Sequence, residues 1–238
     1  MMSTPTPNAI MMELSSMGSE QNKKVLAKHG AREPFFGVKV GDMKKIVKRI
    51  KKNHEISLEL YATGNYDAMY LAGLIADETR ISRADLNRWA KESYAGISEY
   101  TVPWVASESP HGWELALEWI ESDKANMAAA GWSSLSNWVA LRPDAELDQT
   151  KLGHLLDRVK QEVHSAPNRV RYAMNCYVIA AGSYVSALTS KAKEIAKAVG
   201  PITVEMGATS CTVPSAFDYI LKIENMGRIG KKKKQARC

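Results

Sequence analysis

Apolar residues recur at helical spacing along almost the whole chain, and this periodicity limits the possible fold more than any other feature. The clearest example has apolar side chains at offsets of 0, 3, 4, 7, 8 and 11: Val170, Ala173, Met174, Tyr177, Val178 and Ala181. Residues at this spacing share one face of an α-helix. No segment combines the alternation, turn dipeptides and β-branched residues of a β-hairpin. The sequence therefore predicts an all-α protein.

Capping signals divide this pattern into separate helices. Asn65 is placed to cap a helix over 66–77, Ser82 and Asp85 form a capping box, and Asn126 is placed to cap a further helix. Helix starts near residues 66, 99, 126 and 168 follow at intervals of 33, 27 and 42 residues, close to the period of helical repeats. We expect these helices to lead pairs. The pattern predicts degenerate HEAT-like helical repeats that form a single curved α-solenoid.

Proline-containing joints, without long linkers, separate the helices, so we expect one repeat domain. A chain of 238 residues with 45% hydrophobic side chains is long enough to bury a sizeable core. We assign residues 20–227 to the repeat domain, residues 1–19 to a flexible N-terminal segment, and residues 228–238 to a basic C-terminal tail.

The formal net charge of +6 is concentrated in this tail. Residues 228–238 hold six basic side chains and no acidic one, which leaves 26 basic residues to balance 26 acidic ones. A neutral body with a cationic end is typical of a protein that meets a polyanion. The basic residues of the tail are Arg228, Lys231, Lys232, Lys233, Lys234 and Arg237.

Two further cationic elements lie within the body of the chain. An amphipathic helix is expected over 43–52, and its polar face carries Lys44, Lys45, Lys48 and Arg49. On the helix from Asn168, the polar face includes Arg169 and Arg171, side chains able to contact phosphates. Three separate cationic elements favour double-stranded DNA as the partner.

Other classes of protein are disfavoured. No stretch approaches the roughly 20 apolar residues of a membrane span, and residues 1–7 lack the features of a secretion signal. Cys176, Cys211 and Cys238 are far apart, which suits reduced thiols, and no Cys-x-x-Cys or His-Glu-x-x-His spacing occurs. We expect a monomer in the cytoplasm, nucleoid-associated when bound to DNA, with no membrane span, no metal and no cofactor.

The segment over 36–45, Phe-Gly-Val-Lys-Val-Gly-Asp-Met-Lys-Lys, resembles the aromatic-Gly-Val/Ile-x-x-x-x-Leu/Met-Arg/Lys opening of the DNA alkylation repair family of HEAT-repeat DNA glycosylases. The resemblance extends to about Gly200. It implies a monofunctional glycosylase that hydrolyses the N-glycosidic bond of cationic N3- or N7-alkylated purines. In that chemistry a carboxylate stabilises the oxocarbenium-like sugar, and tryptophans cradle it.

Active members share a Ser-Trp-Trp-Asp-x-x-Asp element, which aligns with residues 93–99, Ser-Tyr-Ala-Gly-Ile-Ser-Glu. The resemblance places Ala95 at the cradling tryptophan and Glu99 at the catalytic aspartate. It places Ala129 at a DNA-holding arginine and Tyr177 at a second tryptophan. Tyr177 also lies on the apolar stripe, so core packing and DNA contact both remain open. Loss of one ring contact and one phosphate contact implies excision at least about a hundredfold slower.

Three functions remain open. The first is a DNA-binding protein that recognises damaged or branched duplex mainly through phosphates, with weak or no excision. The second is an active 3-methyladenine or 7-methylguanine glycosylase that uses Glu99 as its catalytic residue. The third is a protein-binding solenoid scaffold. Most tryptophans are expected to pack between helices, and Trp132 is the best candidate for a base-stacking platform.

Overall fold

The computed structural model describes residues 5–237, and within this range the chain forms thirteen α-helices and no β-strand. The helices are α1 (Pro7–Met17), α2 (Glu20–Lys28), α3 (Val40–Ile50), α4 (His54–Ala62), α5 (Tyr66–Ile75), α6 (Arg83–Glu92), α7 (Val102–Glu108), α8 (Gly112–Trp119), α9 (Ala125–Leu141), α10 (Gln149–Glu162), α11 (Asn168–Tyr184), α12 (Thr189–Val199) and α13 (Ala216–Asn225). A π-helical turn, η1 (Ile97–Thr101), leads directly into α7, and short 3₁₀ turns lie at η2 (Asp144–Glu146) and η3 (Ser186–Leu188).

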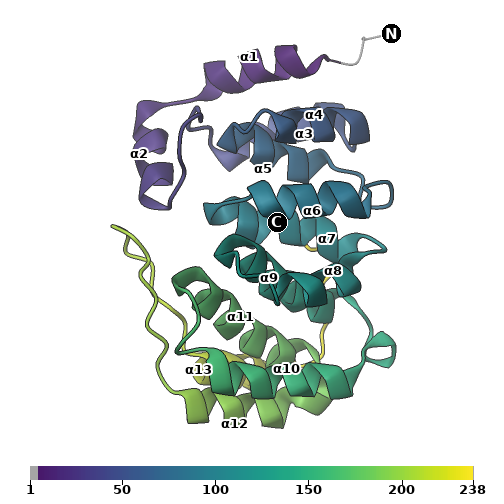
Figure 1. Ribbon diagram of the computed structural model, residues 1–238, viewed down its shortest axis with the longest axis vertical. Coiled ribbons are helices and arrows are strands. Elements are labelled where there is room, and N and C mark those ends of the chain that lie inside the picture. Colours follow the sequence, from purple (N-terminus) through teal and green to yellow (C-terminus); the bar gives the residue numbers. More distant parts are fainter. Residues whose placement is uncertain (1–4, 238) are drawn as a thin grey trace.

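The helices stack in chain order along the long axis of the molecule, from α1 to α12 and α13 (Figure 1). Contacts run from α5 through η1 and α7 to α9 and on to α11, and we call these the inner helices. They begin at Tyr66, Ile97, Ala125 and Asn168, close to the four predicted starts. The all-α, HEAT-like solenoid is therefore confirmed. In the chain, however, each inner helix comes directly after its pair partner, which is α4, α6, α8 or α10. The inner helix is therefore the second member of its pair and not the leading one.

Two of the three predicted caps are confirmed. The Asn65 side chain accepts from the backbone N–H groups of Asp67 and Ala68 at 3.1 and 3.2 Å. The Ser82 hydroxyl accepts from the Asp85 N–H at 3.0 Å and donates to its carboxylate at 2.6 Å. The third prediction is wrong, because Asn126 lies inside α9.

The Asn126 amide donates to the carbonyls of Ala90, Lys91 and Ser93 at 2.9, 3.1 and 2.9 Å. These carbonyls lie at the C-terminal end of α6, where the last turn of a helix leaves acceptors without intrahelical donors. Asn126 therefore caps the end of a neighbouring helix and not the start of its own.

The expectation of a flexible segment over 1–19 is wrong for residues 7–17, which form α1. Ile10 and Leu14 stand four residues apart on one face of this helix, and both are fully buried. The helix packs on α4 and α5 at the end of the stack. Residues 1–4 lie outside the described part of the chain. Burial of this apolar pair gives α1 its place in the fold.

The glycine-containing segment over 36–38 is held by one buried carboxylate, that of Asp67. It accepts from the backbone N–H groups of Phe36, Gly37 and Val38 at 2.5, 3.0 and 2.9 Å. Gly37 has φ of +78°, and a Cβ there would lie 2.6 Å from the backbone nitrogen of Lys23. Only glycine fits this close approach, which explains the residue at the centre of the opening motif.

Buried apolar residues form two clusters that meet at α8 and α9. One extends from Ile10 to Ala130 and the other from Ala116 to Ile220. The tail leaves α13, which packs in the second cluster, yet its Ala236 is buried in the first. The tail therefore spans both halves of the solenoid.

The tail follows the C-terminal ends of the inner helices. Hydrogen bonds join the Gly230 N–H to the Ser183 carbonyl of α11 (2.9 Å) and the Lys233 N–H to the Ala140 carbonyl of α9 (2.8 Å). Farther along, the Ala236 N–H donates to the Glu108 carboxylate at the end of α7 (2.5 Å). A free tail is therefore not observed.

Two tail cations point inward at these helix ends. The Lys232 ammonium donates to the Val139 carbonyl at 2.9 Å and pairs with Asp144 at 2.7 Å. The Arg237 guanidinium donates to the Ala76 carbonyl, just past α5, at 3.1 Å. The C-terminal end of a helix carries partial negative charge and unpaired carbonyls, so cations are stabilised there.

Candidate nucleic-acid interface

A cavity of about 870 Å³ lies between α2, three inner helices and the segment over 205–212. This segment belongs to the extended chain that rises toward the lower end of α2 at the left of Figure 1. The cavity walls are rich in tyrosine, from α5, the η1 region and α11: Tyr66, Tyr70, Tyr94, Tyr100 and Tyr172. The four-residue spacing of Tyr66 and Tyr70 indicates a shared helix face, but no sequence pattern connects these two rings with the other three.

Glu99 and Arg169, 70 residues apart in the chain, form a bidentate ion pair in this cavity. The Arg169 Nε donates to Glu99 Oε1 at 2.5 Å, Nη2 donates to Oε2, and Nη1 donates to the Met206 sulfur at 3.4 Å. The Glu99 side chain is only 4% exposed. Each guanidinium nitrogen thus already has an acceptor within the protein.

Burial opposes the charge on Arg169, but hydrogen bonds and attraction from Glu99 outweigh it and raise the pKa of the guanidinium. The guanidinium therefore stays charged, and its hydrogen bonds are directed to groups within the protein. The sequence assigned Glu99 to catalysis and Arg169 to DNA binding. The structure brings these two residues together in one contact.

Two tyrosines of the cavity wall and a neighbouring thiol are neutral at physiological pH. Burial raises the pKa of the Tyr66 and Tyr172 hydroxyls above their ordinary value. Beside Tyr172, burial and the charge of Glu99 raise the pKa of the Cys176 thiol to about 12. Cys176 is therefore protonated and is not a nucleophile.

Two positions that align with functional residues of active members carry alanine in place of a tryptophan and an arginine. Ala95 adopts a left-handed backbone conformation, with φ of +45°, and carries no ring. The adjacent wall is formed by Tyr94, whose ring lies 4.4 Å from the Arg32 guanidinium and whose hydroxyl donates to the Arg32 carbonyl at 3.2 Å. Ala129 is fully buried in α9 and cannot reach a phosphate.

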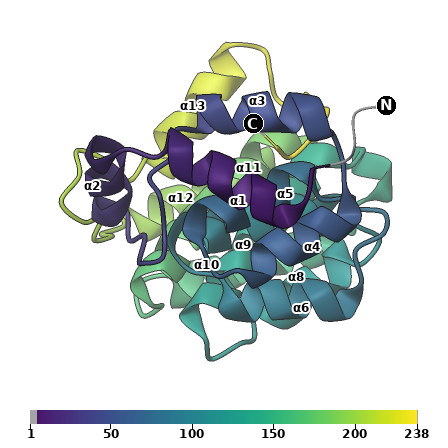
Figure 2. The same ribbon diagram turned by 90° about the horizontal axis from the view of Figure 1, so that it is seen from above.

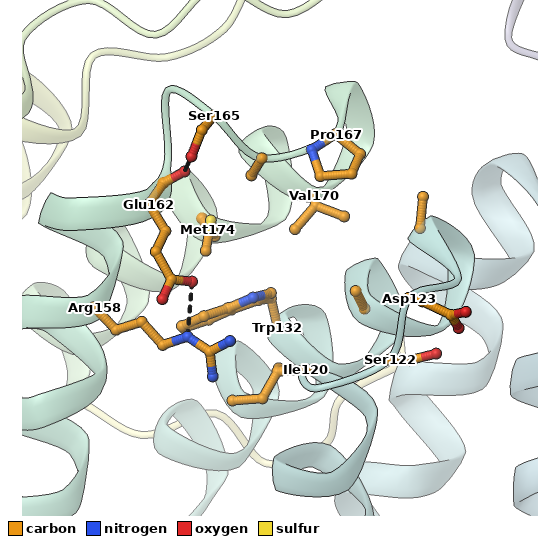
Figure 3. Close-up of a pocket in the computed structure, with 13 residues that line it drawn as sticks. Ile120, Ser122, Asp123, Trp132, Arg158, Glu162, Ser165, Pro167, Val170 and Met174 are labelled. Atoms are coloured by element: carbon orange, nitrogen blue, oxygen red, sulfur yellow. Dashed lines mark hydrogen bonds and ion pairs between the residues drawn. The ribbon is translucent and has the colours of Figure 1, made fainter.

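Tyr177 and Trp132 belong to the core, so the DNA contact considered for Tyr177 and the stacking role for Trp132 are wrong. Tyr177 is fully buried, and its hydroxyl donates to the Leu152 carbonyl at 3.0 Å. Its ring lies 5.3 Å from that of Trp132, which is 1% exposed. Figure 3 shows the Trp132 indole in a separate cavity of about 250 Å³, beside an Arg158 guanidinium held by Glu162. No base can stack on either ring.

The basic face of α3 lies on the surface, as the periodicity predicts, with Met43 and Ile46 buried beneath it. Its four named cations differ in their partners. Lys45 pairs with Asp42 at 2.7 Å, and Arg49 pairs with Glu13 of α1. Lys44 and Lys48 form no ion pair within residues 5–237 and remain exposed. Seen from above, α3 lies at the rim of the stack, on the same side of the view as α13 (Figure 2).

A second cavity, of about 420 Å³, lies between α9, α11, α13 and the tail, and we call it the tail cavity. Arg228, Lys231 and Lys233 line it, and none of them forms an ion pair within the described residues. The α11 residue Tyr172 lines both this cavity and the tyrosine-rich one. The two cavities are therefore neighbours along one helix. Arg171, on the same helix, lines neither and is partly buried.

Other kinds of site find no support in the part of the chain that the structure describes. Between residues 5 and 237, no three His, Cys, Asp or Glu side chains gather in an arrangement that could hold a metal ion. Over the same range, no helix has the length and apolar character needed to cross a membrane.

Comparisons with known proteins agree with the fold. The sequence profile described as "DNA alkylation repair enzyme" matches residues 10–192. Uncharacterised proteins of Listeria innocua and Listeria monocytogenes are each 33% identical over 220 residues, which cover 90% of this chain and 95% of theirs. A solved structure superposes with a TM-score of 0.90 and 39% identity, covering 98% of this chain and 100% of the other. That structure is described as a new family of proteins related to the HEAT-like repeat DNA glycosylases with affinity for branched DNA structures.

Proposed function

Because this chain belongs to the DNA alkylation repair enzyme family, we propose that it binds branched or otherwise distorted duplex DNA. In this proposal, it recognises DNA mainly through phosphates and excises bases weakly or not at all. The affinity for branched DNA described for the similar solved structure supports the choice of ligand.

The observation that carries the proposal is the ion pair between Glu99 and Arg169. A carboxylate that stabilises an oxocarbenium-like sugar must direct uncompensated negative charge at it. Here both Glu99 oxygens accept from Arg169, and the side chain is 4% exposed. Separation of a buried pair leaves a costly unpaired charge, so the carboxylate is held away from catalysis. The absence at Ala95 of a ring that could cradle the sugar also favours weak or no excision.

Binding through phosphates is supported by the exposed cations that form no ion pair within the protein. Within residues 5–237 these include six of the cations predicted to contact DNA: Lys44, Lys48, Arg228, Lys231, Lys233 and Lys234. If each neutralises one phosphate, the logarithm of the binding constant should fall with the logarithm of salt concentration with a slope of about −5.

The experiment measures binding and excision on the same DNA. A four-way junction and its matched duplex, with and without N7-methylguanine, are titrated by fluorescence anisotropy over a range of salt. Free base release is then measured under single-turnover conditions. We expect tighter binding to the junction, the steep salt dependence, and no release above background.

A matched pair of variants tests the phosphate contacts. Replacement of Lys44 and Lys48 by alanine should reduce the magnitude of the salt slope by about 2. Replacement of Arg83 and Arg88 of α6, which pair with Glu114 and Asp85, is the control and should leave the slope unchanged. Equal slopes for all three proteins would remove α3 from the interface.

The other two functions have distinct outcomes in this experiment. Release of 7-methylguanine that disappears in Glu99→Gln would identify an active glycosylase and overturn the proposal. Absence of DNA binding at physiological salt, together with a co-purifying protein, would favour a protein-binding scaffold.

A further inference from the structure

We propose that the tail cavity binds one nucleotide of a single-stranded DNA segment, with its phosphate on the tail cations and its base on Tyr219. The inference rests on the proposed function in taking DNA as the ligand. It adds a specific subsite, and a reason why a branch point with unpaired nucleotides is preferred to a continuous duplex.

The cations of the cavity are arranged by the backbone of the tail. Successive side chains of an extended chain point to opposite sides. Lys232 points inward to Asp144 and the Val139 carbonyl, whereas Lys231 and Lys233 on either side of it line the cavity. Arg228 joins them, and no acidic residue lines the cavity. Three cations that form no ion pair, in a cavity lined by no carboxylate, provide an environment suited to a phosphate.

An exposed aromatic ring provides the surface for a base. Tyr219 of α13 lines the cavity and is 46% exposed, although large rings are usually covered. Ile179 and Ile223 add apolar wall beside it. Stacking of a base on such a ring tolerates any sequence, because every base has an aromatic face.

An unpartnered hydroxyl points to a ligand independently of the charges. Ser183 of α11 lines the cavity, is 3% exposed, and its Oγ has no hydrogen-bond partner. A buried hydroxyl without a partner is unfavourable, and a ligand oxygen in the cavity would satisfy it. The volume of about 420 Å³ lies within the range of small-molecule sites, roughly 300–1,000 Å³.

The full-length protein and a short fluorescent oligothymidylate test the proposal. We expect wild type to bind the oligonucleotide, Ser183→Ala to weaken binding about fivefold, and Tyr219→Ala to weaken it about tenfold. Ser134→Ala is the matched control, because Ser134 is also buried with an unpartnered Oγ but does not line the cavity. It should bind like wild type. Thermal unfolding of every variant checks that the fold is retained.

Two competitors, thymidine 5′-monophosphate and inorganic phosphate, distinguish a DNA strand from a free ligand. Weak competition by both supports the strand. Competition by either as strong as that of unlabelled oligonucleotide would assign the cavity to a free nucleotide or phosphate and overturn the proposal. No oligonucleotide binding, or equal binding by the Ser183 and Ser134 variants, would also overturn it. Wild-type binding to a blunt four-way junction is measured in parallel, so failure of the proposed function is seen separately.

Discussion

Arg237 forms an ion pair with Glu78, 159 residues earlier in the chain, with 2.7 Å between Nη2 and Oε2. Both side chains are nearly buried, 11% and 10% exposed. Glu78 also pairs with Lys52, which follows α3. One carboxylate therefore joins the end of the basic tail to the end of the basic helix. The tail, whose charge alone suggests contact with a polyanion, is therefore also partly a structural brace.

Loss of Arg237 should destabilise the fold. Arg237→Ala removes the contact to Glu78 and the hydrogen bond to the Ala76 carbonyl, and should lower the free energy of unfolding by about 2–3 kcal/mol. Urea unfolding followed by circular dichroism measures it. The control is Lys234→Ala, since Lys234 is exposed and forms no ion pair within residues 5–237. Equal stability of the two variants would show that the brace contributes nothing.

The contribution of this contact should depend on pH. Burial by itself would raise the pKa of Glu78, but the Lys52 hydrogen bond and the charge of Arg237 outweigh it and hold the pKa below its ordinary value of 4.5. A depressed folded-state pKa stabilises the protein above the unfolded value, and this stability is lost as pH falls through the folded one. The difference between wild type and Arg237→Ala should therefore be full at pH 7 and shrink below pH 4.5. A constant difference down to acid pH would contradict this account.

Replacement of the Asp67 carboxylate should loosen the segment over 36–38. Asp67→Asn keeps the shape of the side chain but loses the charge and one acceptor from three backbone hydrogen bonds. We expect a loss of about 3 kcal/mol, and faster hydrogen exchange at the amides of Phe36, Gly37 and Val38. Asp77→Asn is a suitable comparison, because Asp77 accepts only from Thr79 in an exposed turn. A similar effect from both substitutions would argue against Asp67 as the anchor.

Ala95 should tolerate glycine, unlike an alanine within a helix. At φ of +45° the Cβ of Ala95 is unfavourable, by about 1 kcal/mol, whereas glycine adopts this conformation freely. Ala95→Gly should leave the free energy of unfolding unchanged or raise it by up to about 1 kcal/mol. Ala128→Gly, inside α9, should lower it by about 1 kcal/mol. Thermal unfolding of both variants distinguishes them, and a marked loss in Ala95→Gly would contradict the strain.

Local signals in the sequence predicted much of the fold. The apolar stripe that includes Val170 and Met174 predicts α11, and the Ser82–Asp85 capping box predicts the start of α6. These features require only residues within a few positions of one another, because helical periodicity and capping are local. The prediction for Asn126 was wrong because the contacts of this residue are not local. Its partners lie on another helix, more than 30 residues away.

The candidate site shows the same division. The sequence by itself determined an all-α solenoid, an exposed basic face on α3, and the absence of a ring at Ala95. Only the tertiary structure decided that Glu99 neutralises Arg169, that Tyr177 is core, and that tail cations alternate between helix ends and a cavity. Charge and periodicity are read from neighbouring residues, but whether a cation is free depends on acceptors that the folded chain brings to it. In this protein those acceptors include carbonyls at the ends of stacked helices, which no sequence pattern marks.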